Sequence, residues 1–173
     1  MRILLLISAI LATAGCANTA TIDQDTAYSN PNISKAVSAY VSLPQDVAYG
    51  GRHFTGSGGS VSGIISAKLS HFLVSVEKAN SVENFHDAMQ QARKNGADYL
   101  FYPSIILWQD RATEWEGKPD RVEIKITVVD LSNYQVVSSA TIKDESSLTV
   151  TGRSHPQDLL HKPVGSYIES IFR

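Results

Sequence analysis

Two kinds of residue are scarce in this 173-residue chain, and each scarcity excludes a class of protein. Cys16 is the only cysteine, so an internal disulfide bond is excluded and cysteine cannot build a zinc site. Lysine and arginine number 15 against 17 acidic residues, and they form no basic run or stripe. A nucleic acid is therefore not an expected partner.

The short motifs that mark catalysis and cofactor binding are also missing. The chain has no phosphate-binding Gly-x-x-x-x-Gly-Lys loop, no Gly-x-Ser-x-Gly motif and no His-Glu-x-x-His motif. Its histidines show no metal-ligand spacing with carboxylates; they are His53, His71, His86, His155 and His161. We therefore expect no enzyme, no catalytic residue, no metal site and no cofactor.

The N-terminal residues have the pattern of a secretory signal. Met1-Arg2 precedes an apolar stretch, residues 3–12, that is too short to span a bilayer, which needs roughly 20 residues. Thr13-Ala14-Gly15-Cys16 then reads as a lipobox, in which the cysteine receives a diacylglycerol and the chain is cut before it. We expect residues 1–15 to be removed and Cys16 to anchor the protein through lipid.

Two alternatives to lipidation concern the fate of this signal: ordinary secretion, and a chain that stays in the cytosol. Ala12-Thr13-Ala14 also satisfies the rule for ordinary cleavage, which would release the protein without an anchor. That route would export a lone unpaired thiol into an oxidising compartment, so lipidation is favoured. Ala17 stands where aspartate would signal retention in the inner membrane. The expected location is the outer membrane, with the protein facing the periplasm.

Composition divides the rest of the chain into a tether and a domain. Residues 16–35 are polar and poor in large aliphatic side chains, which predicts the lipidated cysteine followed by a flexible linker. An edge strand in this segment is the alternative. Residues 36–173 have the length of a single domain.

Hydrophobic periodicity and turn residues predict the elements of that domain. Asn80 and Glu83 are expected to form the capping box of the second helix, and Gly96 to follow its end. Pro103 predicts an edge, bulge or bend, and Pro163 a kink or split in the last helix. The expected elements are strand 36–43, loop 45–59, a helix from 60 to about 72, strand 73–76, a helix from 80 to about 95, strand 98–108, hairpin strands 121–131 and 134–144, and a helix from about 155.

This order, β-α-β-α-β-β-β-α, predicts a single α+β domain with a mixed sheet and helices packed on one side. The strand 121–131 places Val122, Ile124 and Ile126 on one face, while Glu123 and Lys125 lie opposite. That alternation is typical of a sheet with one face in water.

Four segments of the chain resemble a family of uncharacterised proteobacterial lipoproteins: residues 51–58, 95–103, 108–121 and 155–160. The similarity covers about residues 36–173 and is most specific from Trp108 to Arg121. More loosely, the element order is similar to the periplasmic domain of the curli secretion lipoprotein and to the N-terminal domain of the Tol–Pal translocation protein. The resemblance implies an envelope domain that makes protein contacts.

The segment 110–121 is the strongest candidate for a partner or ligand surface. It links two predicted strands and combines aromatic, basic and acidic side chains, namely Arg111, Glu114, Trp115, Asp120 and Arg121. Tryptophan and arginine are enriched at binding hot spots because they join apolar area to directed hydrogen bonds. The alternative is that its arginines pair locally with its carboxylates and order a long hairpin.

A glycine-rich loop is the second candidate. It runs through Arg52, Ser57, Gly58, Gly59 and Ser60 into the first helix, where backbone N–H groups could bind an anion. The alternative is structural: the glycines permit a tight turn, and Ser57 or Ser60 caps the helix.

These patterns predict a lipid-anchored envelope protein that is a non-enzymatic accessory or assembly factor. We expect it to present one sheet face, or the loop around Trp115, to another envelope protein. The alternative is a periplasmic module that binds a small anionic or glycan ligand through the glycine-rich loop and the pair Arg111 and Arg121.

Overall fold

The computed structural model describes residues 20–28, 33–34, 37–49, 51–110, 119–146 and 155–172. Its strands are β1 (Thr21–Gln24), β2 (Ser38–Leu43), β3 (Val47–Tyr49), β4 (Arg52–Phe54), β5 (Ser75–Val82), β6 (Tyr99–Gln109), β7 (Arg121–Asp130) and β8 (Gln135–Glu145). Its α-helices are α1 (Ser57–Leu69), α2 (Phe85–Lys94) and α3 (Pro156–Ile171), and a 3-10 turn, η1, spans Thr26–Tyr28. The expected order of elements is confirmed.

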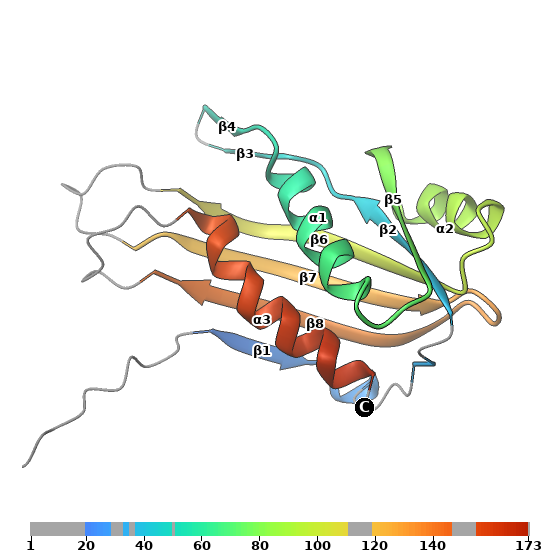
Figure 1. Ribbon diagram of the computed structural model, residues 1–173. Helices are drawn as coiled ribbons and strands as arrows, with labels where there is room; N and C mark the ends of the chain where they lie inside the picture. The colour runs from blue at the N-terminus through green and yellow to red at the C-terminus, as the bar shows by residue number, and fades with distance from the viewer. Residues whose placement is uncertain are drawn as a thin grey trace, which may run out of the picture.

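Six of the strands form one mixed sheet in the order β1-β8-β7-β6-β2-β5 (Figure 1). β2 is parallel to both β5 and β6, whereas β6, β7, β8 and β1 pair antiparallel in succession. β3 and β4 form a separate short hairpin inside the segment 45–59, where we expected only a loop. The α+β class and the mixed sheet are confirmed.

The main core lies between the sheet and the helices α1 and α3, which pack against each other. Ile124 and Ile126 of β7 are fully buried here, in agreement with the predicted alternation. Tyr167 of α3 is also fully buried, and its hydroxyl lies 2.8 Å from the Ser138 hydroxyl of β8. In the described part of the chain, no helix has the length and apolarity needed to cross a membrane.

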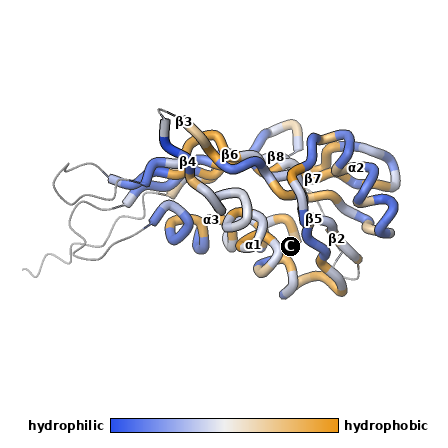
Figure 2. Tube along the Cα trace, turned by 90° about the horizontal axis from the view of Figure 1, so that it is seen from above, coloured by the Kyte–Doolittle hydropathy of each residue, from blue (hydrophilic) through white to orange (hydrophobic). Residues whose placement is uncertain are grey.

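Helix α2 lies on the opposite face of the sheet, so the expectation that the helices pack on one side is wrong (Figure 2). It buries Ala88 and Ala92 against a second cluster that includes Tyr40, Leu100 and Val129. β2 and β6 carry apolar residues on both faces, as strands covered on both sides do. A sequence pattern of this kind does not indicate which helix covers which face.

The tether prediction is wrong for residues 21–24, which form the edge strand β1. β1 pairs antiparallel with β8, and Ile22 lies opposite Ile142. The pairing ends where the Asp25 N–H donates to the Ser139 carbonyl oxygen at 2.9 Å. An edge strand is held mainly by its hydrogen bonds to one neighbour, so a polar composition does not exclude it. Cys16 lies outside the described residues.

The second helix begins later than expected. Asn80 lies within β5, and Asn84 caps α2 by accepting the Asp87 N–H at 3.0 Å. The apolar alternation of residues 73–76 was too short to show that β5 continues to Val82. Gly96 follows the helix with a φ of 72°, as its expected position after the C-terminus requires.

Two prolines behave differently from each other. Pro103 pairs with Ile126 of β7, but the pairing of β6 with β2 ends at Phe101, so Pro103 lies just past the shared stretch. This position matches the expected edge. By contrast, Pro163 does not split α3, which continues to Ile171.

Candidate functional site

One part of the sheet is uncovered on the side opposite α1 and α3. It is formed by β6, β7, β8 and β1, away from α2, and of the elements that the structure describes none lies over it (Figure 2). We call this part the open face. Its side chains stand in rows across the strands: Gln109, Arg121 and Glu145; Leu107, Glu123, Lys143 and Thr21; Ser104, Lys125, Thr141 and Asp23.

Opposite charges face each other across β7 and β8 on the open face. The Arg121 Nε lies 3.1 Å from the Glu145 Oε2, and the Lys143 Nζ lies 3.4 Å from the Glu123 Oε1. Because Arg121, Glu123 and Lys125 alternate in sign along β7, the charges form a checkerboard in both directions. Such a surface has no net sign, so it does not favour a uniformly anionic or cationic partner.

A shallow groove of about 230 Å³ lies within the open face. Leu107 is the one large aliphatic residue of this groove whose side chain faces the open face. It follows a bulge in β6, at which Ile106 is 54% exposed. The charged side chains around it on this face are Arg121, Glu123, Lys143 and Glu145. An apolar centre inside a polar rim is the usual anatomy of a protein–protein contact.

The border of the open face next to α2 is aromatic. Phe85 at the start of α2 meets Tyr102 of β6 edge to face, with ring centroids 5.1 Å apart, and remains 38% exposed. The Tyr40 hydroxyl donates to the Glu83 Oε1 at 2.9 Å. Burial, and then this bond to Glu83, raise the pKa of Tyr40, so it stays a neutral donor.

Of the five candidate residues in the segment 110–121, the structure describes Asp120 and Arg121. Arg111, Glu114 and Trp115 lie outside the described residues. Asp120 is buried, and its N–H donates to the Ser146 Oγ at 2.9 Å. Arg121 stands on the open face and pairs with Glu145, which the sequence did not suggest as its partner.

Sequence reasoning therefore missed Leu107, Lys143 and Glu145. The signal that could have found Lys143 and Glu145 was the alternation of β8, continued across the predicted hairpin to β7. Leu107 follows a bulge in β6, where the register shifts between Ile105 and Leu107. Register decides which residues lie opposite each other, and the hairpin contains a shift between Val128 and Val129 that the sequence does not reveal.

The N–H groups of the glycine-rich loop already bind a carboxylate of the protein itself, that of Asp46. The Asp46 carboxylate accepts the N–H groups of Gly56 and Gly58, both at 2.8 Å, and the Ser57 hydroxyl at 3.4 Å. These hydrogen bonds, chiefly that from Gly56, hold the pKa of Asp46 below its usual value despite the opposing effect of burial. An external anion would have to displace this carboxylate.

The capping expectation for the same loop is wrong. Helix α1 begins at Ser57, three residues earlier than expected, and Gly56 at its N-cap has a φ of 87°. The Ser57 Oγ accepts the Val47 N–H at 3.0 Å, and the Ser60 hydroxyl donates to the Gly56 carbonyl at 3.0 Å. Asp46 therefore takes the capping role that we assigned to the serines.

The other members of the loop play different parts. Arg52 is exposed on β4, outside the cap. A Cβ at Gly58 would lie 2.1 Å from the Pro44 carbonyl oxygen, whereas a Cβ at Gly59 would meet no atom within 4 Å. Gly58 is thus required by a close backbone approach, and Gly59 is not.

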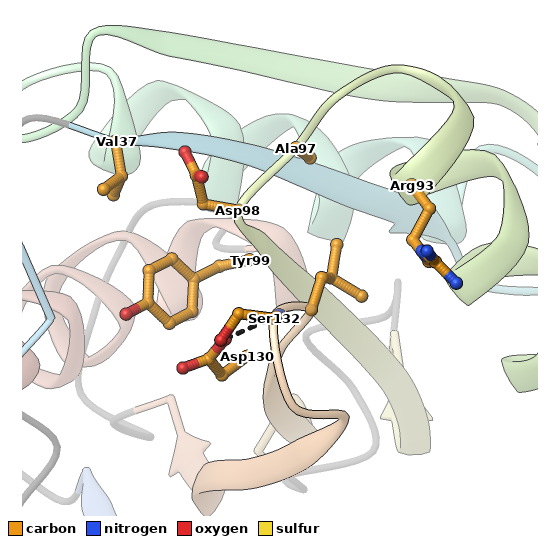
Figure 3. A pocket seen from close by; sticks show the side chains of 8 residues that line it. Val37, Arg93, Ala97, Asp98, Tyr99, Asp130 and Ser132 are labelled. Carbon is orange, nitrogen blue, oxygen red and sulfur yellow. Dashed lines mark hydrogen bonds between the residues drawn. The ribbon is translucent and has the colours of Figure 1, made fainter.

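A second groove, of about 310 Å³, lies at the other end of the sheet (Figure 3). Tyr99 stands between Asp98 and Asp130, and burial followed by these two carboxylates raises its pKa. The carboxylates serve the local backbone: Asp98 accepts the Ser38 N–H at 2.8 Å, and Asp130 accepts the Ser132 N–H at 2.8 Å. The described residues contain no group of three or more potential metal-ligating side chains.

Comparisons with known proteins agree with this architecture. Residues 32–171 match a family model described as "Domain of unknown function (DUF4823)". No curated protein matches the chain. Among solved structures, the PelC dodecamer from Paraburkholderia phytofirmans shares 18% identity and a TM-score of 0.69, over 88% of this chain and 96% of that one.

Two further solved structures are more distant. Protein XCC0632 from Xanthomonas campestris has 12% identity and a TM-score of 0.46, over 87% of each chain. Lipoprotein GNA1162 from Neisseria meningitidis has 18% identity and a TM-score of 0.47, over 77% of this chain and 98% of that one. The likeness to PelC shows a shared fold.

Proposed function

We propose that this chain, which belongs to the DUF4823 family as the match over residues 32–171 shows, is a lipoprotein of the bacterial envelope with a non-enzymatic accessory role. Cys16 carries the lipid that anchors it to the outer membrane, and the domain faces the periplasm. It acts by docking another envelope protein on the open face.

The observation that carries this proposal is the uncovered half of the sheet. Leu107 provides apolar area, and the paired charges around it provide directional contacts. Protein contacts of this kind bury an apolar centre and keep a polar rim. A solved protein of the same fold, PelC, is itself an assembly of twelve copies, which supports a contact role for this fold.

The alternative of a small anionic or glycan ligand loses its main support. The N–H groups of Gly56 and Gly58 are occupied by Asp46. Arg121 is engaged by Glu145 on the open face. The alternative would regain support if a candidate ligand raised the free energy of unfolding by RT ln(1 + [L]/Kd) as its concentration increased.

Photocrosslinking in intact cells tests the proposal. A photoreactive residue replaces Lys125, which is exposed on the open face, in one variant and Trp115 in a second. In the control variant it replaces Glu169, which is exposed on α3. We expect a discrete protein adduct from position 125 and none from position 169. Anchored and folded protein that gives no adduct at 125 would overturn the docking role of the open face.

A further inference from the structure

We infer that the protein docked on the open face is a second copy of this chain, packed face to face about a two-fold axis that runs parallel to β7 and β8. This inference rests on the proposed function, because it names the partner of the same surface. Its basis is that the charges of the open face are complementary to themselves under that symmetry.

The register of β7 and β8 produces this complementarity. Arg121 lies opposite Glu145, and Glu123 lies opposite Lys143. A two-fold axis midway between the two strands, and parallel to them, places β7 of one copy over β8 of the other without shifting the rows. Arg121 of each copy then faces Glu145 of the partner copy, and Glu123 faces Lys143 of the partner copy.

No like charges meet in this arrangement. Lys125 lies opposite Thr141 in the register, so it faces the partner copy's threonine and not a cation. Thr141 in turn lies opposite Asp23 of β1, which places an exposed carboxylate one strand away from the incoming lysine. The symmetry therefore converts each ion pair within a chain into a cluster of two cations and two anions.

The geometry of packed sheets is compatible with these contacts. Facing sheets lie about 10 Å apart, a distance that the long arginine, lysine and glutamate side chains can span near the axis. The side chains of Arg121 and Glu145 are 50% and 45% exposed, so each has room to pair with a residue of the partner copy. An interface of this type is isologous and closes after two copies.

The β5 edge of the sheet, at the end opposite β1, is a poorer surface for a second copy. β5 forms this edge, and it has an irregular register between the β2 positions Val41 and Leu43. It also exposes Glu77 and Lys78. Bulges and charged residues, lysine especially, are features by which edge strands resist pairing with other chains.

Charge reversal with rescue tests the inference. Two full chains carrying different affinity tags are co-expressed, extracted in detergent and purified through one tag, and the recovery of the other tag is measured. We expect wild-type chains to co-purify. Glu123→Lys in both chains, or Lys143→Glu in both, should lower recovery about tenfold, because like charges then face each other. Glu123→Lys in one chain with Lys143→Glu in the other should restore recovery, because opposite charges face again.

A matched control carries the same charge change elsewhere. Glu169→Lys on the exposed surface of α3 should leave recovery at the wild-type level. Unchanged recovery in both single reversals, or no rescue in the mixed pair of folded chains, would overturn the inference. If that happened while position 125 still crosslinked a different protein in cells, the docking role of the open face would stand and only the second copy would be rejected.

Discussion

The Asp46 carboxylate accepts the N–H of Gly58 at 2.8 Å, so a side chain from the loop before β3 caps a helix that starts more than ten residues later. The same residue, Gly58, lies against the Pro44 carbonyl oxygen, where a Cβ would be 2.1 Å away. The short segment Pro44 to Asp46 thus holds the first turn of α1 in two ways. The Pro44 carbonyl packs against Gly58, and the Asp46 carboxylate accepts the Gly58 N–H.

Replacing Gly58 by alanine should destabilise the fold. The added methyl group would overlap a backbone carbonyl, which cannot move as the end of a flexible side chain can, so we expect a loss of about 2 kcal/mol in the free energy of unfolding. Urea denaturation followed by circular dichroism measures it. Gly59→Ala is the matched control: its Cβ meets no atom within 4 Å, and it should be neutral or stabilising by about 0.5 kcal/mol.

Asp46→Ala should lower the free energy of unfolding by about 1 kcal/mol at neutral pH, as loss of a helix cap does. The pKa of Asp46 is lowered in the folded protein from its ordinary value of 3.8. Its stabilisation is therefore complete above that ordinary value and is lost as the pH falls through the lower folded-state pKa. Denaturation between pH 7 and pH 2 should show a smaller acid destabilisation in the variant; equal slopes for both proteins would contradict the assignment.

Tyr167→Phe should cost about 1–2 kcal/mol, because the fully buried Ser138 hydroxyl would lose its partner at 2.8 Å. Burial raises the pKa of Tyr167 to about 12, so the phenol stays protonated at ordinary pH. The double variant with Ser138→Ala should be less destabilised than the sum of the two single variants. Strict additivity in a double-mutant cycle would show that the two hydroxyls do not interact.

Cys16→Ser should abolish lipid attachment and leave the domain folded. Metabolic labelling with an alkyne fatty acid should mark the wild-type protein and not the variant, because the thioether to the lipid needs sulfur. The variant should also leave the membrane fraction, since acyl chains contribute about 0.8 kcal/mol per buried methylene to anchoring. Labelling retained in the variant would exclude lipidation at Cys16.

Local sequence signals were reliable where a single element carried its own evidence. Gly96 follows α2 in the left-handed conformation, and Ile124 and Ile126 face the core as alternation predicted. They were misleading where a distant segment supplied the partner. Asp46 replaces the serines as the cap of α1, and β8 holds Thr21–Gln24 in the sheet although that segment is polar.

By itself, the sequence determined the α+β class, the order of elements and the lack of a disulfide bond, because periodicity, capping residues and cysteine content act within one element or on the whole chain. Tertiary structure decided that α2 crosses to the other face of the sheet and that Arg121 stands opposite Glu145. Strand register and helix placement depend on which surfaces bury each other across long sequence separations. The open face is therefore a property of packing, and only the folded chain displays it.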